Sequence, residues 1–232
     1  MIHEAMTTPT TAPTTVLEAI QAGAKQLTDA KVAFGHGTTN AFDEAAWLVL
    51  WKAGLPLDSS LDDPKIDADS VANTPIAGEL LAYIATLFIA RIASRKPAAY
   101  LTQEAWLQGI PFYIDERAIV PRSFIAELLA DGSFDDWLGP HTKRVLDLCT
   151  GNGSLAVLAA MTYPETTVVA ADISTDALEV AQINIAKHGL QDRIQLVESD
   201  SWNGLKGEIF DLVLCNPPYV NSTSMAKLPA EY

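Results

Sequence analysis

The second half of the chain alternates between short apolar runs and helical patterns, and this alternation constrains its fold more than any other feature. In each run, the odd and the even positions are both mainly apolar, which is typical of parallel strands buried on both faces. Helical patterns over 154–163 and 176–188 separate the runs, and Ser174 and Gly189 cap the second helix. We therefore predict a doubly wound α/β sheet. Its predicted strands are 144–149, 167–171, 194–197 and 210–215.

Residues 14–98 have a different periodicity and predict a small N-terminal helical domain. Thr15 and Glu18 form a capping-box pattern at the start of a first helix. A second helix is expected to begin at Asn40 and to end at Gly54. The residues that we expect this second helix to bury are Ala46, Trp47, Leu50 and Trp51.

The chain therefore divides into segments of different character. Residues 1–13, rich in Thr and Pro, are expected to form a disordered tail. Residues 99–120 predict a β-hairpin that links the helical domain to the α/β domain, which spans 121–232. We expect the helical domain to recognise a substrate and the α/β domain to bind a cofactor.

The composition limits the classes of partner. With 49% hydrophobic and 19% charged residues, the chain is typical of a soluble globular protein. The net charge of −14 argues against sequence-independent nucleic-acid binding, which depends on Lys and Arg. An acidic surface attracts basic partners, of which ribosomal proteins are one class, although the charge is equally explained as an aid to solubility.

The sequence predicts neither a membrane segment nor a metal site. The longest apolar run, 80–90, is much shorter than the roughly 20 residues that span a bilayer. The start of the chain lacks the pattern of a signal peptide, so we expect a cytoplasmic protein. The histidines do not cluster, and Cys149 and Cys215 have no metal-ligand spacing. Both cysteines end predicted strands that we expect to be neighbours, as reduced thiols.

A glycine turn, Asp147-Leu-Cys-Thr-Gly151-Asn-Gly153, follows the first predicted strand. Gly151 and Gly153 allow the backbone to turn tightly and to approach a ligand closely. The turn lacks the dinucleotide-binding fingerprint, because Ala156 stands at the position of its last glycine. Asp147 would repel a pyrophosphate but would tolerate a sulfonium or amino cation.

Acidic residues end the next two predicted strands. Asp172 ends the second, where a carboxylate can accept hydrogen bonds from both hydroxyls of a ribose. Asp200, followed by Ser201, ends the third, where an adenine would lie. Each carboxylate alone is equally explained as a solvated loop residue. Their succession at the edge where open α/β sheets bind ligands favours a cofactor site.

The tetrapeptide Asn216-Pro217-Pro218-Tyr219 follows the fourth predicted strand. Proline fixes φ and lacks an N–H group, so the Asn216 side chain and the nearby carbonyls are left for a ligand. Such acceptors suit the planar –NH2 group of an amide or an adenine, and Tyr219 can cover a flat group. The alternative is an ordinary turn at the end of a strand, because Asn-Pro is a common breaker.

Together these motifs resemble the S-adenosylmethionine-dependent Rossmann-like methyltransferases, and most closely the protein-glutamine N5-methyltransferase family, which also has an N-terminal helical domain. The resemblance implies methyl transfer from S-adenosylmethionine to a glutamine side-chain amide. It implies that Asn216 and Pro217 hold this amide, with Pro218 and Tyr219 completing the catalytic motif. The residues predicted to contact the cofactor are Asp147, Cys149, Thr150, Gly151, Asn152, Gly153, Asp172, Asp200, Ser201 and Asn216.

Segments around Tyr100, Pro121 and 225–232 resemble the branch of the family that acts on the third large-subunit ribosomal protein, a basic substrate. The sister branch, which acts on peptide-chain release factors, typically has Gly where Cys149 stands. Three further hypotheses stay open: an enzyme of this sister branch, a nucleic-acid adenine-N6 methyltransferase, and a non-catalytic module that binds the cofactor or a ribosomal protein. The resemblance also implies further strands beyond Tyr232, so we expect a C-terminally incomplete sheet.

Overall fold

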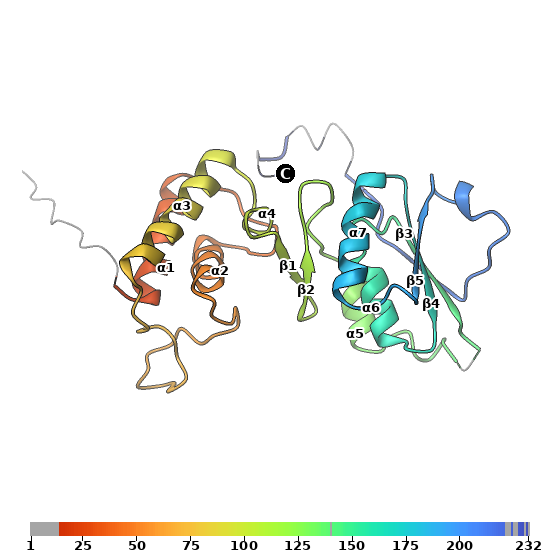
Figure 1. Cartoon of the computed structure of the whole chain (residues 1–232), viewed down its shortest axis with the longest axis horizontal. Helices are drawn as coiled ribbons and strands as arrows, with labels where there is room; N and C mark the ends of the chain where they lie inside the picture. The colour runs from red at the N-terminus through yellow and green to blue at the C-terminus, as the bar shows by residue number, and fades with distance from the viewer. Residues whose placement is uncertain (1–13, 140, 221–223, 225–226, 230, 232) are drawn as a thin grey trace, which may run out of the picture. The chain divides into compact units, whose positions relative to one another are not determined.

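The computed structural model describes residues 14–139, 141–220, 224, 227–229 and 231 (Figure 1). The predicted tail, 1–13, and half of the segment 225–232 lie outside these residues. The chain divides into two compact units, one formed by the chain up to Phe34 with Thr38–Ala98, the other by Gly35–Gly37 with Ala99–Tyr232. In the part of the chain that the structure describes, every helix is too short or too polar to cross a membrane.

The first unit is helical, and its first two helices begin where the capping residues predict. Helix α1 (Val16–Asp29) has the predicted capping box, in which the Thr15 hydroxyl accepts from the Glu18 N–H group and the Glu18 carboxylate accepts from the Thr15 N–H group. Helix α2 (Ala41–Ala53) begins after Asn40 and ends at Gly54 in the left-handed conformation. Helix α3 is Gly78–Ser94.

The buried face of α2 differs from the prediction. Its buried apolar residues are Ala45, Leu48, Val49 and Leu50, whereas Ala46, Trp47 and Trp51 are only half-buried. The apolar residues extend around most of the helix, so periodicity alone did not identify the face that packs against α1.

A buried ion pair that the sequence analysis missed joins α2 to α3. Arg91 Nε donates to Glu44 Oε1 at 2.6 Å, and both side chains are almost fully buried. Arg91 Nη2 also donates to the Ala33 carbonyl at 2.9 Å. Because a buried charge is costly without a partner, loss of either side chain would strongly destabilise this unit.

The second unit begins with small elements and continues as an α/β sheet. The predicted hairpin pairs β1 (Glu104–Leu107) with β2 (Ile110–Tyr113) in antiparallel register. The remaining elements are α4 (Ala98–Thr102), α5 (Phe124–Ala130), β3 (Arg144–Leu148), α6 (Ser154–Thr162), β4 (Thr167–Asp172), α7 (Thr175–Lys187), β5 (Ile194–Glu198), the 3-10 turn η1 (Asn203–Leu205) and β6 (Leu212–Cys215). The short helix α4 was not predicted.

The sheet is parallel, and its strand order is β5-β4-β3-β6. Strand β3 is central, so that Leu148 pairs with Ala171 of β4 on one side and with Cys215 of β6 on the other. This pairing makes the ends of β4 and β6 the neighbours of the end of β3. The register also fixes which side chains share a face, because side chains alternate between the two faces along each strand.

Helices α5, α6 and α7 lie on one side of the sheet (Figure 1). The core beneath them includes Val145, Ala170 and Leu214. On the opposite face, Leu146 and Val169 pack against Leu205 of the short 3-10 helix η1. The predicted parallel α/β sheet is therefore confirmed. The expectation that every strand is buried on both faces holds for β3 and β4, whereas β5 and β6 are partly exposed.

Gly153 brings the turn after β3 close to α7. Its φ is +80°, and a Cβ atom there would lie 2.9 Å from the Ala181 Cβ and 3.1 Å from the Ala181 Cα. Gly151 also has a positive φ, +55°, but a Cβ there would meet no atom within 4 Å. The two glycines are therefore required for different reasons, close packing at Gly153 and backbone conformation at Gly151.

We predict that Gly153→Ala lowers the free energy of unfolding by about 2–4 kcal/mol, because it combines left-handed strain with overpacking against α7. Gly151→Ala, the matched control, adds only the conformational strain and costs about 1 kcal/mol. Urea unfolding measures both. Equal losses for the two variants would contradict the close packing of Gly153 against Ala181.

Candidate functional site

The residues predicted to end neighbouring strands lie along the carboxyl edge of the sheet. Following the strand order from β5 to β6, the edge carries Asp200, Asp172, Gly151 and Asn216. Parallel strands present their carboxyl ends at the same edge, where open α/β sheets bind ligands. The sheet thus brings together four segments that are widely separated in the sequence.

Asp172 connects the glycine turn to the next strand. Its Oδ2 accepts a hydrogen bond from the Gly151 N–H group at 2.9 Å, and its Oδ1 accepts from the Ser174 N–H group at 3.0 Å. Each carboxylate oxygen can accept more than one hydrogen bond, and the side chain is only half-buried. The carboxylate can therefore support the turn and still accept hydroxyl groups of a ligand.

Asp147 supports the same turn from beneath and is fully buried. Its Oδ2 accepts from the Thr150 hydroxyl and, at 3.0 Å, from the Ala156 N–H group. Its Oδ1 has no hydrogen-bond partner among the described residues. Burial raises the pKa of the Asp147 carboxyl to about 6, while these two hydrogen bonds oppose the shift. The sequence suggested a carboxylate facing a cation, whereas the structure places Asp147 under the turn.

The glycine turn has open space beside Gly151, where a Cβ atom would meet nothing within 4 Å. Cys149, which precedes it, has a φ of +63°. This conformation is unfavourable for residues other than glycine, by about 1–2 kcal/mol. Asn152 is buried, and its Nδ2 has no hydrogen-bond partner among the described residues. An open backbone next to carboxylates fits S-adenosylmethionine, which carries a ribose and a positive sulfonium, and it disfavours a diphosphate.

The two cysteines lie at the ends of neighbouring strands, as expected. Cys215 pairs with Leu148, the residue before Cys149. Both are free thiols. Burial, reinforced by the neighbouring Cys215 and by Asp172, raises the pKa of the Cys149 thiol to about 11. Cys149 is therefore protonated at neutral pH and is a poor nucleophile.

Asp200 and Ser201 lie beyond the end of β5, and both are exposed. The turn that carries them depends on Ser199, a buried residue that the sequence analysis missed. The Ser199 hydroxyl donates to the Ser201 carbonyl at 2.7 Å and accepts from the Gly204 N–H group at 2.9 Å. A serine shortly after a predicted strand is a signal for such a turn.

The tetrapeptide Asn216–Tyr219 begins where β6 ends, and all four side chains are exposed. Asn216 Nδ2 donates to the Arg122 carbonyl at 3.4 Å. This bond leaves the Asn216 Oδ1 as an available acceptor. Tyr219 is 76% exposed, so its ring can still cover a bound group. The structure thus places an amide oxygen one strand away from the glycine turn.

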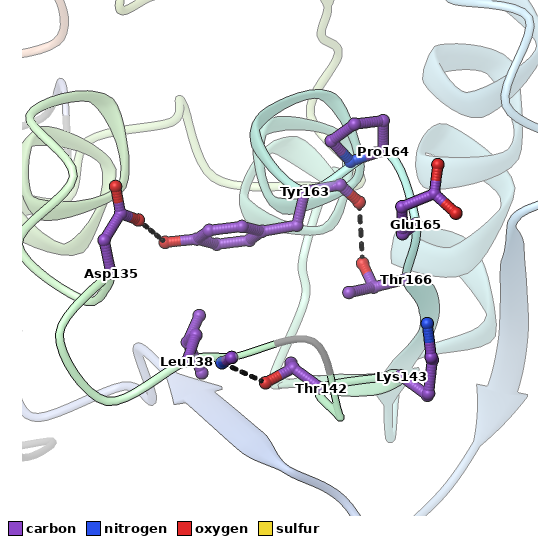
Figure 2. A pocket seen from close by; sticks show the side chains of 9 residues that line it. Asp135, Leu138, Thr142, Lys143, Tyr163, Pro164, Glu165 and Thr166 are labelled. Atoms are coloured by element: carbon purple, nitrogen blue, oxygen red, sulfur yellow. Dashed lines mark hydrogen bonds between the residues drawn. The ribbon is translucent and has the colours of Figure 1, made fainter.

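A hollow of about 440 Å³ lies at the opposite, amino edge of the sheet (Figure 2). Tyr163 donates to Asp135 across it at 3.3 Å. None of the predicted site residues lines it. The lining residues, which include those just before β3 and β4, are Asp135, Leu138, Gly139, Thr142, Lys143, Tyr163, Pro164, Glu165 and Thr166.

Comparison with known proteins identifies the family of the chain. Residues 127–229 match the family described as Methyltransferase small domain. The chain is 45% identical, over 240 residues, to the ribosomal protein uL3 glutamine methyltransferase of Burkholderia pseudomallei, an alignment that covers 98% of this chain and 74% of that protein. The chain belongs to the uL3 glutamine methyltransferase family. It is therefore an S-adenosylmethionine-dependent methyltransferase, which confirms the resemblance seen in the sequence.

A second relative has the same name, and solved methyltransferase structures show weaker similarity. The enzyme of the same name from Bordetella pertussis is 45% identical over 220 residues, which cover 94% of this chain and 71% of that protein. Among solved structures, a human methyltransferase 10 domain containing protein is 22% identical, with a TM-score of 0.40 over 48% of this chain and 55% of its own.

We predict that Asp147 makes the stability of this family member depend on pH. Its folded-state pKa of about 6 lies above the unfolded value of about 4, so the folded state binds the proton more tightly. The resulting stabilisation is present at low pH and is lost as the pH rises through about 6. From pH 4 to pH 7, the difference in unfolding free energy between Asp147→Asn and the wild type should therefore shift by about 2–3 kcal/mol in favour of the variant.

Urea unfolding of both proteins at the two pH values measures this difference. Asp211→Asn is the matched control, because hydrogen bonds from the Lys143 and Arg144 N–H groups lower the pKa of Asp211 and its pH dependence has the opposite sign. A difference between Asp147→Asn and wild type that is the same at both pH values would contradict the buried carboxyl described above.

Proposed function

We propose that this chain transfers a methyl group from S-adenosylmethionine to the side-chain amide nitrogen of a glutamine in ribosomal protein uL3. Relatives with that name align with almost the whole chain. The pairing of β3 with β6, which makes the glycine turn and Asn216 neighbours, is the observation that carries the proposal. A methyl donor at the turn would lie beside an acceptor for a substrate amide.

The cofactor is assigned to the turn Cys149–Gly153 and to the strand ends beside it. Gly151 offers open backbone, and Asp172 offers carboxylate oxygens for the ribose hydroxyls. The exposed Asp200 and Ser201 are assigned to the adenine side. Asp147, being buried, acts by holding the turn in place. When bound, the cofactor supplies an electrophilic methyl group on a positively charged sulfur.

The substrate amide is assigned to Asn216 and Pro217. An amide nitrogen is a weak nucleophile because its lone pair is delocalised into the carbonyl. Acceptance of its two N–H bonds by the Asn216 Oδ1 and the Pro217 carbonyl would fix the orientation of the amide and aim the nitrogen at the methyl group. The bond from Asn216 Nδ2 to the Arg122 carbonyl favours this orientation of the Asn216 side chain. Tyr219 is assigned to cover the amide.

The charge of the chain supports a basic protein as substrate. A net charge of −14 attracts a ribosomal protein and disfavours a nucleic acid. The helical unit, residues 14–98, is assigned to recognition of this protein. Ribosomal proteins are made in the cytoplasm, and we place the reaction there.

We predict that Asn216→Ala lowers kcat for methyl transfer at least a hundredfold, because one of the two acceptors that orient the amide is lost. The dissociation constant for S-adenosylmethionine should change less than threefold, because the cofactor is assigned mainly to the turn Cys149–Gly153 and to Asp172. A methyltransferase assay and calorimetry measure the two effects.

Arg122→Ala is the matched control, because it removes a neighbouring side chain but keeps the main-chain carbonyl that Asn216 contacts. This variant should retain kcat within a few-fold. Turnover of Asn216→Ala at the wild-type rate would disprove the proposed role of Asn216.

The substrate is tested by mass spectrometry of uL3 after incubation with the chain and S-adenosylmethionine. We expect one added methyl group, on a glutamine side chain. A peptide-chain release factor and an unmethylated DNA duplex, offered under the same conditions, should remain unmodified. Methylation of the release factor or of adenine in preference to uL3 would contradict the proposal.

A further inference from the structure

Asn184 of α7 joins the glycine turn to the hairpin, and it is fully buried. Its Oδ1 accepts from the Tyr113 N–H group at 2.7 Å. Its Nδ2 donates both hydrogens, one to the Tyr113 carbonyl at 2.9 Å and one to the Asn152 carbonyl at 2.9 Å. The Asn184 amide therefore uses both of its N–H donors, and its partners lie on two segments that are far apart in the sequence.

The bond to Asn152 acts on the peptide unit in the middle of the glycine turn. The next residue, Gly153, packs so closely on Ala181 that it leaves no room for a Cβ atom. Ala181 and Asn184 are three residues apart on α7, so they lie on the same face of the helix. The turn is thus held on α7 by a close contact and by a hydrogen bond, one helical turn apart.

The bonds to Tyr113 act on the last residue of β2. Together they pair both main-chain groups of Tyr113 with one side chain, as a neighbouring strand would. A second contact holds the same hairpin on α7, because the Pro111 carbonyl lies 3.0 Å from His188 Nε2. Within the described part of the chain, the contact of His188 reaches the hairpin alone, whereas the bonds of Asn184 reach both the hairpin and the turn.

We propose that Asn184 is a positioning residue for the cofactor. It fixes the direction of the Asn152–Gly153 peptide, and it makes the geometry of the turn depend on the hairpin. This inference rests on the proposed assignment of the cofactor to the turn. A polar side chain among Val180, Ala181 and Ile185 on the inward face of a helix is costly unless it is fully bonded, which Asn184 achieves only while hairpin and turn are both docked.

Calorimetric titration with S-adenosylmethionine tests this role in the full chain. Asn184→Ala and Asn184→Asp, which both lose the donors, should raise the dissociation constant at least tenfold. His188→Ala is the matched control, because it loosens the same hairpin without touching the turn, and its dissociation constant should stay within threefold of the wild-type value. The melting temperatures of all variants separate a loss of binding from a loss of folding.

Equal dissociation constants for the Asn184 and His188 variants, at matched stability, would overturn the role of Asn184. Asp172→Ala, titrated in parallel, distinguishes this result from a failure of the cofactor assignment. If Asp172→Ala binds S-adenosylmethionine as the wild type does, the assignment itself is wrong. If it is weakened while the Asn184 variants are not, only the positioning role is wrong.

A measurement on the wild-type chain covers the case in which the Asn184 variants do not fold. Saturation with S-adenosylmethionine should slow hydrogen exchange of the Tyr113 amide at least fivefold, because that amide shares Asn184 with the turn. The Leu107 amide, on the other hairpin strand, should change less than twofold. Unchanged exchange of the Tyr113 amide at saturation would overturn the coupling.

Discussion

The parallel pairing of β3 with β6 is the interaction on which the rest of the site depends. Its register places Leu148 opposite Cys215, so the glycine turn and the Asn-Pro-Pro-Tyr corner begin at the same level of the sheet. A slip of one residue would turn the side chains of β6 to the opposite face and would shift Asn216 along the edge. The pairing of β3 with β4 fixes the position of Asp172 in the same way, on the other side of β3.

The features that could be predicted from the sequence are those with a local cause. Thr15, Asn40 and Ser174 cap helices at the predicted positions, because each side chain bonds an N–H group within three residues. The strands could be predicted equally well, since short apolar runs that alternate with helices predict a parallel sheet. The positions of Asp172 and Asn216 at one edge follow directly from that topology.

The features that could not be predicted depend on contacts between distant segments. Neither the pairing of Glu44 with Arg91 nor that of Asn184 with Tyr113 leaves a pattern along the chain. Asp147 illustrates the same limit within a recognised motif: its position in the turn was clear, but its burial depends on packing between β3 and α6. The partial exposure of β5 and β6 was likewise not predictable from the apolar runs.

A crystal structure of the chain with S-adenosylhomocysteine and a glutamine-containing uL3 peptide would locate both reacting groups. We expect the sulfur beside Gly151, the ribose hydroxyls on Asp172, and the glutamine amide on Asn216 Oδ1, at adjacent strand ends. A ligand in the hollow beside Tyr163, or a glutamine held away from Asn216, would contradict this expectation.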